Sequence, residues 1–158
     1  MTTSTILSNA SYGKRQEFMA VAELIRRGFD VYLTLVDDKG IDCIIRKSDQ
    51  RYLDIQIKAR SAKIEAKNYG YFPLLNVPSN RDNHFFVFYS EKANEYWVLP
   101  SEEIIRLAEV DGSCAHIALS GKDIGKYAIR LTGVSKGEAV PKKQFAAYQG
   151  DEGFKLLK

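Results

Sequence analysis

The spacing of apolar residues near the start of the chain predicts a helix over residues 12–28. Four apolar positions recur at helical spacing: Phe18, Val21, Ala22 and Ile25. Charged residues gather on the opposite side, and Gly28 is a typical C-terminal stop. We therefore expect one amphipathic helix that packs its apolar stripe against the rest of the protein.

The pattern then changes to short extended segments rich in strand formers. These segments are residues 29–35, 41–46 and 52–59, and turns are predicted at 37–40 and 48–50. The last segment alternates with period two, so Asp54, Gln56 and Lys58 share one face of the strand. The predicted order is a helix followed by a three-stranded meander.

The second half of the chain predicts further strands and one helix. Residues 61–83 read as a loop with short elements, because glycine and proline interrupt them. The expected strands are residues 84–90, 95–99, 115–119 and 127–131, with a turn at 91–94. Ser101 is a favourable N-cap after Pro100 and starts the predicted helix. The fold class is α/β, with a mixed central sheet of about five strands flanked by helices.

Length and composition favour a single globular domain over residues 1–158. The chain is 45% hydrophobic and 27% charged, and its apolar runs are too short to cross a bilayer. The first residues lack the pattern of a secretory signal, so we expect a cytoplasmic protein and no membrane partner. Cys43 and Cys114 lie 71 positions apart, which argues against a disulfide framework.

The net charge of +3 comes from the first half of the chain. Residues 1–70 hold 12 basic and 9 acidic side chains, whereas residues 71–158 hold 11 of each. A local basic run follows the third predicted strand: Lys58, Arg60, Lys63 and Lys67. Such a run suits a nucleic-acid backbone, although a solvated loop would also carry it.

Three separated pieces of sequence carry the candidate chemistry. Glu17 falls between Val21 and Leu24 around the predicted helix, inside the apolar arc, where an ionised carboxylate needs a partner. Asp42 starts an otherwise apolar strand, and Gln56 and Lys58 share one face of the next. Each piece has an ordinary structural alternative: a Glu17 bonded to Lys14, an aspartate in a turn, and a solvated sheet face. Their convergence would instead form a site.

Such a cluster suits hydrolysis of a phosphodiester. Mg²⁺ prefers oxygen ligands and keeps several waters, so a carboxylate, an amide oxygen, a backbone carbonyl and a second acid through water can hold it. The ion polarises the phosphate and lowers the pKa of a bound water. A neighbouring lysine can stabilise the charge that grows on the phosphate.

This arrangement resembles the PD-(D/E)xK nuclease superfamily, in its branch that includes the Holliday-junction resolvases. The resemblance covers residues 12–60 and rests on Gly13-Lys14-Arg15-Gln16-Glu17, Gly40-Ile41-Asp42 and Gln56-Ile57-Lys58. It implies a restriction-endonuclease-like fold with Asp42 as the principal ligand of Mg²⁺ or Mn²⁺. It also implies that the Ile57 carbonyl binds the metal, that Glu17 is the helix acid, and that Lys58 is the motif lysine.

The sequence departs from the family pattern in two places. Gln56 stands where Asp or Glu is usual, which removes one charge from the metal site, although Asp54 on the same strand face can supply a carboxylate. Residues 61–83 lack the helix that many members place there. One expectation is that Lys63, Lys67 and Tyr69 follow a nucleic-acid backbone instead, with Tyr71 or Phe72 free to stack on bases. The alternative, which stays open here, is a solvated loop with partly buried aromatic residues.

The sequence therefore predicts a Mg²⁺-dependent endonuclease that cuts DNA and acts as a homodimer. The expected catalytic residues are Glu17, Asp42, Gln56 and Lys58, and the expected nucleic-acid contacts are Lys14, Arg15, Arg60, Lys63 and Lys67. Two alternatives remain open at this stage. One is a catalytically inactive nucleic-acid-binding or assembly module with the same fold, which the neutral Gln56 favours. The other is a nuclease that acts on RNA.

Overall fold

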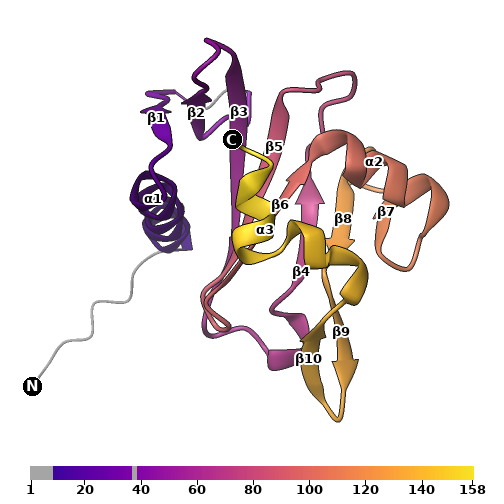
Figure 1. The fold of residues 1–158 in the computed structure, drawn as a ribbon. Coiled ribbons are helices and arrows are strands. Elements are labelled where there is room, and N and C mark those ends of the chain that lie inside the picture. Colours follow the sequence, from indigo (N-terminus) through magenta and orange to yellow (C-terminus); the bar gives the residue numbers. More distant parts are fainter. Residues whose placement is uncertain (1–8, 37–38) are drawn as a thin grey trace, which may run out of the picture.

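A five-stranded mixed sheet is covered by helices on one face and by a helix and a smaller sheet on the other (Figure 1). The computed structural model describes residues 9–36 and 39–158. The strands follow the order β1-β2-β3-β5-β6, with bounds β1 Asp30–Leu33, β2 Cys43–Arg46, β3 Tyr52–Arg60, β5 His84–Ser90 and β6 Glu95–Pro100. Only β3 and β5 run parallel within this sheet, and its other neighbouring strands are antiparallel. The predicted α/β class and the mixed sheet of about five strands are confirmed.

The first helix, α1 (Asn9–Arg26), covers one face of the sheet together with α3 (Gly150–Lys155). Ala20, Val21 and Leu24 of α1 are buried against the sheet residues Cys43, Ile45, Leu53, Ile55, Ile57, Phe85, Val87 and Val98. After Arg26, the N–H of Gly28 donates to Ile25 O and the N–H of Phe29 to Leu24 O. This pair of bonds is a Schellman motif, and it requires the positive φ of +84° at Gly28. Gly28 is the predicted stop.

The predicted apolar stripe of α1 is wrong in part, because the helix is rotated about its axis. Phe18 and Ile25 are 53% and 57% exposed, whereas Gln16 is 1% exposed. The buried face of α1 passes through Gln16, Ala20 and Leu24, which repeat every four residues. Gln16 can be buried because its amide donates to the Glu91 carboxylate at 2.7 Å. A polar anchor, together with apolar packing, therefore fixes the face that α1 turns inward.

The other face of the five-stranded sheet packs against α2 (Ser101–Val110) and a three-stranded sheet. This smaller sheet has the order β4-β8-β7, with bounds β4 Tyr71–Leu75, β7 Ala115–Ile117 and β8 Tyr127–Arg130. Phe86 and Phe88 of β5 point into this second core, whereas Phe85 and Val87 point into the core under α1. Every residue of β5 is buried, as expected for a central strand covered on both faces.

The segments between and after the main strands were predicted less completely. Residues 61–83 contain a short 3₁₀ turn (Ala66–Asn68) and β4, in agreement with a loop carrying short elements. The C-terminal part adds elements that the sequence did not reveal: β9 Thr132–Ser135, β10 Glu138–Pro141, a 3₁₀ segment Lys143–Tyr148, and α3. The predicted turn at 37–40 includes residues 37–38, which lie outside the described residues.

Two further features concern the expectations about membranes and disulfides. Among the described residues, no helix combines the length and the hydropathy needed to pass through a bilayer. Cys43 and Cys114 are both buried as free thiols. They lie in different cores, Cys43 under α1 and Cys114 on the side of α2.

Candidate active site

Asp42 lies one residue before β2 and is bound to β3 through both its main chain and its side chain. Its N–H donates to the carbonyl of Ile55 at 2.9 Å, and its carboxylate Oδ2 accepts the N–H of Ile57 at 2.6 Å. Asp42 is 9% exposed. The carboxylate is therefore held in place at the residue between Gln56 and Lys58.

Gln56 lies on β3 against the chain that leads into Asp42. Its side chain is 5% exposed and contacts Gly40. A Cβ placed on Gly40 would lie 2.8 Å from Gln56 Nε2, and Gly40 has a φ of +71° that also favours glycine. The close contact between Gly40 and the amide brings Gln56 together with the segment that carries Asp42.

Gln56 and Lys58 point to the same face of the sheet, as the period of two predicts. In the parallel register Gln56 pairs with Phe86 and Lys58 with Phe88, and both phenylalanines belong to the core on the side of α2. Gln56 is buried, whereas Lys58 is half-buried. Within the described ranges, Lys58 forms no ion pair with a carboxylate. Along this face of β3, the side chains therefore pass from the buried Gln56 to the half-buried Lys58, whose ammonium group lies nearer to solvent.

Glu17 reaches this neighbourhood from the opposite face of the sheet. Its side chain is 21% exposed and accepts a hydrogen bond from Lys14 at 2.5 Å. This bond is the one predicted for Glu17 in a purely structural role. Burial, together with the charges of Asp42 and Glu17, raises the pKa of the Cys43 thiol to about 12. Both carboxylates therefore act on the same thiol. Because α1 covers the face of Ile55 and Ile57, Glu17 lies on the side of the sheet opposite to Gln56 and Lys58.

Asp54 does not replace the acid that the family pattern places at Gln56. It shares the face of Gln56 and Lys58, as predicted, but its carboxylate forms an ion pair with Arg81. Asn83 Nδ2 lies 3.5 Å from the same oxygen. The sequence could not reveal this pairing, because Arg81 lies in a loop that no periodicity places.

Glu91, which the sequence analysis assigned only to a turn, joins α1 to the main sheet. Its carboxylate accepts hydrogen bonds from Tyr12, from Gln16 at 2.7 Å and from the N–H of Ala62 at 3.0 Å, and it pairs with Arg15 at 2.6 Å. Burial alone would raise the pKa of Glu91, but the bonds from Tyr12 and Ala62 and the charge of Arg15 outweigh it and lower that pKa. The buried Gln16 was the available signal, since a polar residue on an inward helix face needs a partner.

The predicted nucleic-acid contacts lie in different surroundings. Lys14 pairs with Glu17, Arg15 with Glu91, and the exposed Lys67 with Glu65 at 3.1 Å, while Lys63 is exposed. Arg60 is half-buried and donates to the carbonyl of Tyr71 at 2.5 Å. Burial lowers the pKa of Arg60, and the nearby charge of Arg130 lowers it further, whereas Tyr71 raises it. Arg130, which the sequence analysis did not single out, lies 4.4 Å over the Tyr71 ring.

Two aromatic residues expected near nucleic acid belong to the core instead. Tyr69 is 9% exposed and stacks on Trp97 with ring centroids 6.5 Å apart, and Phe72 is 2% exposed and packs on Phe88 at 4.7 Å. The predicted role of Phe72 in base stacking and of Tyr69 on the nucleic-acid backbone is therefore wrong. Tyr71 and Phe72 are neighbours on β4, so their side chains point to opposite faces of the strand. Tyr71 is therefore partly exposed, whereas Tyr69 and Phe72 are buried.

The donors available for a metal ion are mostly neutral. Across residues 9–36 and 39–158, no three His, Cys, Asp or Glu side chains gather in a way that could hold a metal. Among the described residues, the strand that binds Asp42 carries the Gln56 amide and main-chain carbonyls as further oxygen donors. This set fits a hard, oxygen-binding ion such as Mg²⁺, which accepts few protein ligands and keeps waters.

The comparisons with known proteins identify a fold. No protein-family model and no curated protein sequence matches the chain. Among solved structures, the bacterial homing endonuclease I-Ssp6803I superposes with a TM-score of 0.60 over 96% of this chain and 93% of that one, at 19% identity. The chain has a nuclease-like fold. D212, a nuclease from a fusselovirus, aligns over 79% of this chain and 84% of its own, with a TM-score of 0.44 and 17% identity.

Proposed function

We propose that the protein is a metal-dependent endonuclease that hydrolyses DNA phosphodiester bonds, with a Gln-x-Lys variant of the PD-(D/E)xK site. The observation that carries this proposal is the bond between the Asp42 carboxylate and the N–H of Ile57. It fixes a buried carboxylate at the centre of the Gln56-Ile57-Lys58 segment, which is the spacing that the nuclease motif uses. The fold shared with a homing endonuclease supports the same activity.

The metal in this proposal is Mg²⁺ or Mn²⁺. Its ligands would be an Asp42 carboxylate oxygen, the Gln56 amide oxygen and the Ile57 carbonyl, with Glu17 bound through water. When bound, such an ion polarises a phosphate and provides a water of lowered pKa. Because Gln56 is neutral, the set carries one charge fewer than the common pattern, and we expect weaker metal binding.

The side chains around the metal have separate tasks. Lys58 would place its ammonium group next to the phosphate and stabilise the negative charge that grows there. The Ile57 N–H orients the Asp42 carboxylate, so that little reorganisation is needed when substrate binds. Phosphates of the nucleic acid would be contacted by the cations Lys14, Arg15, Arg60, Lys63 and Lys67. Arg130, whose guanidinium lies over the Tyr71 ring, would be a further phosphate contact. Cutting both strands of a duplex requires two centres, so we propose a homodimer.

A cleavage assay tests this function. Purified protein with Mg²⁺ or Mn²⁺ should cut linear, branched or single-stranded DNA, and Asp42→Ala and Lys58→Ala should abolish cutting while circular dichroism shows the fold intact. Asp49→Ala is a matched control, because Asp49 is an exposed carboxylate paired with Arg51 in the β2–β3 turn. Absence of cleavage on every substrate, or variants that cut like wild type, would refute the proposal. RNA of the same sequences separates a ribonuclease from a deoxyribonuclease.

A second candidate is a nucleic-acid-binding or assembly module that keeps the fold without catalysis. The neutral Gln56 favours it, because the site lacks a cluster of three acids among the described residues. Calorimetric titration with Mn²⁺ separates the candidates. Heat of binding that disappears in Asp42→Ala supports the enzyme, whereas salt-sensitive DNA binding without uptake of Mn²⁺ supports the module.

A further inference from the structure

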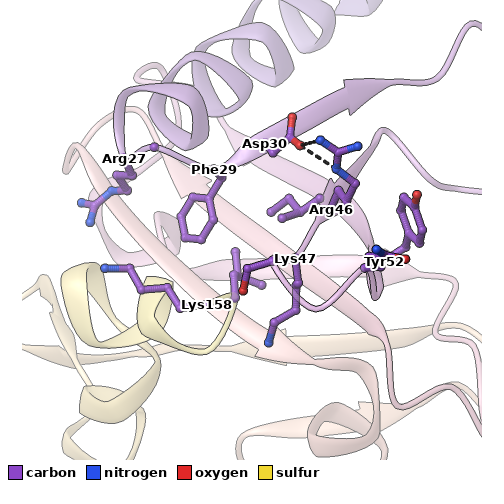
Figure 2. Close-up of a pocket in the computed structure, with 12 residues that line it drawn as sticks. Arg27, Phe29, Asp30, Arg46, Lys47, Tyr52 and Lys158 are labelled. Atoms are coloured by element: carbon purple, nitrogen blue, oxygen red, sulfur yellow. Dashed lines mark hydrogen bonds and ion pairs between the residues drawn. The ribbon is translucent and has the colours of Figure 1, made fainter.

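A cavity of about 790 Å³ opens at the end of the sheet where β2 turns into β3 (Figure 2). It lies between the C-terminal end of α1, the start of β1, the β2–β3 turn and the end of the chain. Glu17, Asp42, Gln56 and Lys58 are not among the residues that line it. The cavity is therefore separate from the candidate active site.

Two arginines of the cavity wall are held by carboxylates. Arg46 pairs with Asp30, with Nε at 2.8 Å and a terminal nitrogen at 2.7 Å from the same oxygen, as Figure 2 shows. Arg27 pairs with Glu23 at 2.6 Å and with Asp151 at 2.7 Å. These pairs fix the positions of both guanidinium groups and largely neutralise them.

Two lysines also belong to the lining. Lys47 and Lys158 form no ion pair among the described residues, and in the view of Figure 2 they lie below Phe29 and Asp30. Hydrogen bonds from Arg51 lower the pKa of Asp49, and the charge of Lys47 lowers it too, so Lys47 lies within electrostatic range of that carboxylate. The nearby Lys155 pairs with Glu152 at 2.6 Å. The lining therefore carries two ammonium groups that form no ion pair within the described part of the chain.

The remaining lining adds apolar and aromatic surface. Ile45 is buried at its base, Phe29 is half-buried, and Tyr52 is 52% exposed at the cavity. A volume of this size lies within the range of sites that hold nucleotide-sized ligands. Two ammonium groups beside aromatic rings suit a molecule that combines an anionic group with a planar one.

We propose that this cavity binds a phosphomonoester carried on a nucleotide or on the end of a nucleic-acid strand. A phosphomonoester carries a charge of about −1.5 to −2 at pH 7, which two lysines balance. Its base would lie against Tyr52 or Phe29. The proposal does not depend on nuclease activity, because neither the metal nor Asp42 contributes to the cavity.

Binding measured in EDTA tests the proposal without a contribution from a metal site. The probes are inorganic phosphate, thymidine monophosphate, and a short single-stranded oligonucleotide with either a 5′-phosphate or a 5′-hydroxyl. We expect the phosphorylated oligonucleotide or the nucleotide to bind more tightly than the hydroxyl form. Tighter binding of the nucleotide indicates a free nucleotide as ligand, and tighter binding of the oligonucleotide indicates a strand end.

Variants locate that binding on the protein. Lys47→Ala and Lys158→Ala should each weaken it about tenfold, the usual effect of losing one charged hydrogen bond. Lys155→Ala, on the adjacent helix but paired with Glu152, should bind like wild type. Equal affinity for the phosphate and hydroxyl forms together with no nucleotide binding, or unchanged affinity in both lysine variants, would overturn the proposal.

Discussion

One buried aspartate, Asp54, lies on β3 and a second, Asp42, is bound to it, and the two carboxylates have different partners. Asp42 is 9% exposed and Asp54 is 8% exposed. Toward the end of β3, Asp42 accepts the main-chain N–H of Ile57. Near its start, Asp54 pairs with the guanidinium of Arg81 beside His84. The N–H of Ile57 orients the Asp42 carboxylate, whereas Arg81 forms an internal ion pair with Asp54.

This difference explains why burial alone is a poor sign of function. A buried ion pair is a structural solution that satisfies both of its partners. A carboxylate oriented by an N–H, beside an amide and a lysine, is arranged as a binding site is arranged. We therefore propose a chemical role for Asp42 and a structural role for Asp54. The predictions that follow test that division, from the largest expected effect to the smallest.

The largest effect is expected for DNA cleavage by matched aspartate variants. Asp42→Asn keeps an oxygen for the Ile57 N–H but removes the charge, so cleavage should fall by roughly 10²–10³-fold, as for loss of one group that stabilises transition-state charge. Asp54→Asn should cut at close to the wild-type rate once the folded fraction is matched. Single-turnover kinetics with Mg²⁺ measures both. Equal losses in the two variants would contradict the division.

The Asp54 end should control how stability depends on pH. Burial and the charge of Arg81, opposed by the charge of Asp54, together lower the pKa of His84 from 6.5 to about 4. Between those two values the unfolded chain binds more protons, so stability is full above about pH 6.5 and falls as the pH approaches 4. The loss over this window is on the order of 3 kcal/mol.

Urea unfolding at several pH values measures that dependence. His84 is 1% exposed, and its Nδ1 lies 2.6 Å from Ser101 Oγ. His84→Gln removes the titration, so its unfolding free energy should change less between pH 6.5 and 4 than that of the wild type. The same slope in both proteins would mean that His84 is not the responsible group.

The ion pair between Asp54 and Arg81 should contribute measurably to stability. Asp54→Ala leaves Arg81 without its partner, and because Arg81 is 39% exposed we expect a loss of about 1–3 kcal/mol in unfolding free energy. Asp49→Ala removes an exposed pair with Arg51 and should cost less than about 1 kcal/mol. A double-mutant cycle with Arg81→Ala isolates the pair. A coupling energy near zero between Asp54 and Arg81 would contradict the structural role of Asp54.

The smallest effect is expected from restoring the family's acid. Gln56→Glu adds a carboxylate beside Asp42, which should tighten Mn²⁺ binding about tenfold and lower the stability of the metal-free protein by like-charge repulsion. Calorimetry measures the first effect and thermal unfolding with and without Mn²⁺ the second. Unchanged Mn²⁺ affinity in Gln56→Glu would show that Gln56 is not part of the metal site.

The sequence predicted the parts of the molecule that local periodicity determines. The meander and β5 follow from runs of strand-forming residues, and the shared face of Gln56 and Lys58 follows from a period of two. The close approach of Asp42 to Ile57 could be anticipated because neighbouring strands of a meander pair. Glu17 was correctly placed between Val21 and Leu24 around α1, although its part in metal binding stays a prediction.

The features that the sequence did not reveal depend on contacts between distant segments. The rotation of α1 follows from hydrogen bonds between Gln16 and Glu91, which are 75 positions apart. The commitment of Asp54 to Arg81 spans 27 positions. Phe72 is buried because β4 turns it onto Phe88 of another sheet. No local pattern encodes these pairings, so the sequence identified candidate residues but not their partners.

The most direct test of the central claim is anomalous diffraction from crystals soaked in Mn²⁺. The account predicts a peak within coordination distance, about 2.0–2.3 Å, of an Asp42 carboxylate oxygen, with the Gln56 amide and the Ile57 carbonyl around it. The peak should vanish in Asp42→Asn and persist in Asp54→Asn. A peak bound at Asp54 instead, or no peak at Asp42 in crystals that hold Mn²⁺ elsewhere, would contradict the account.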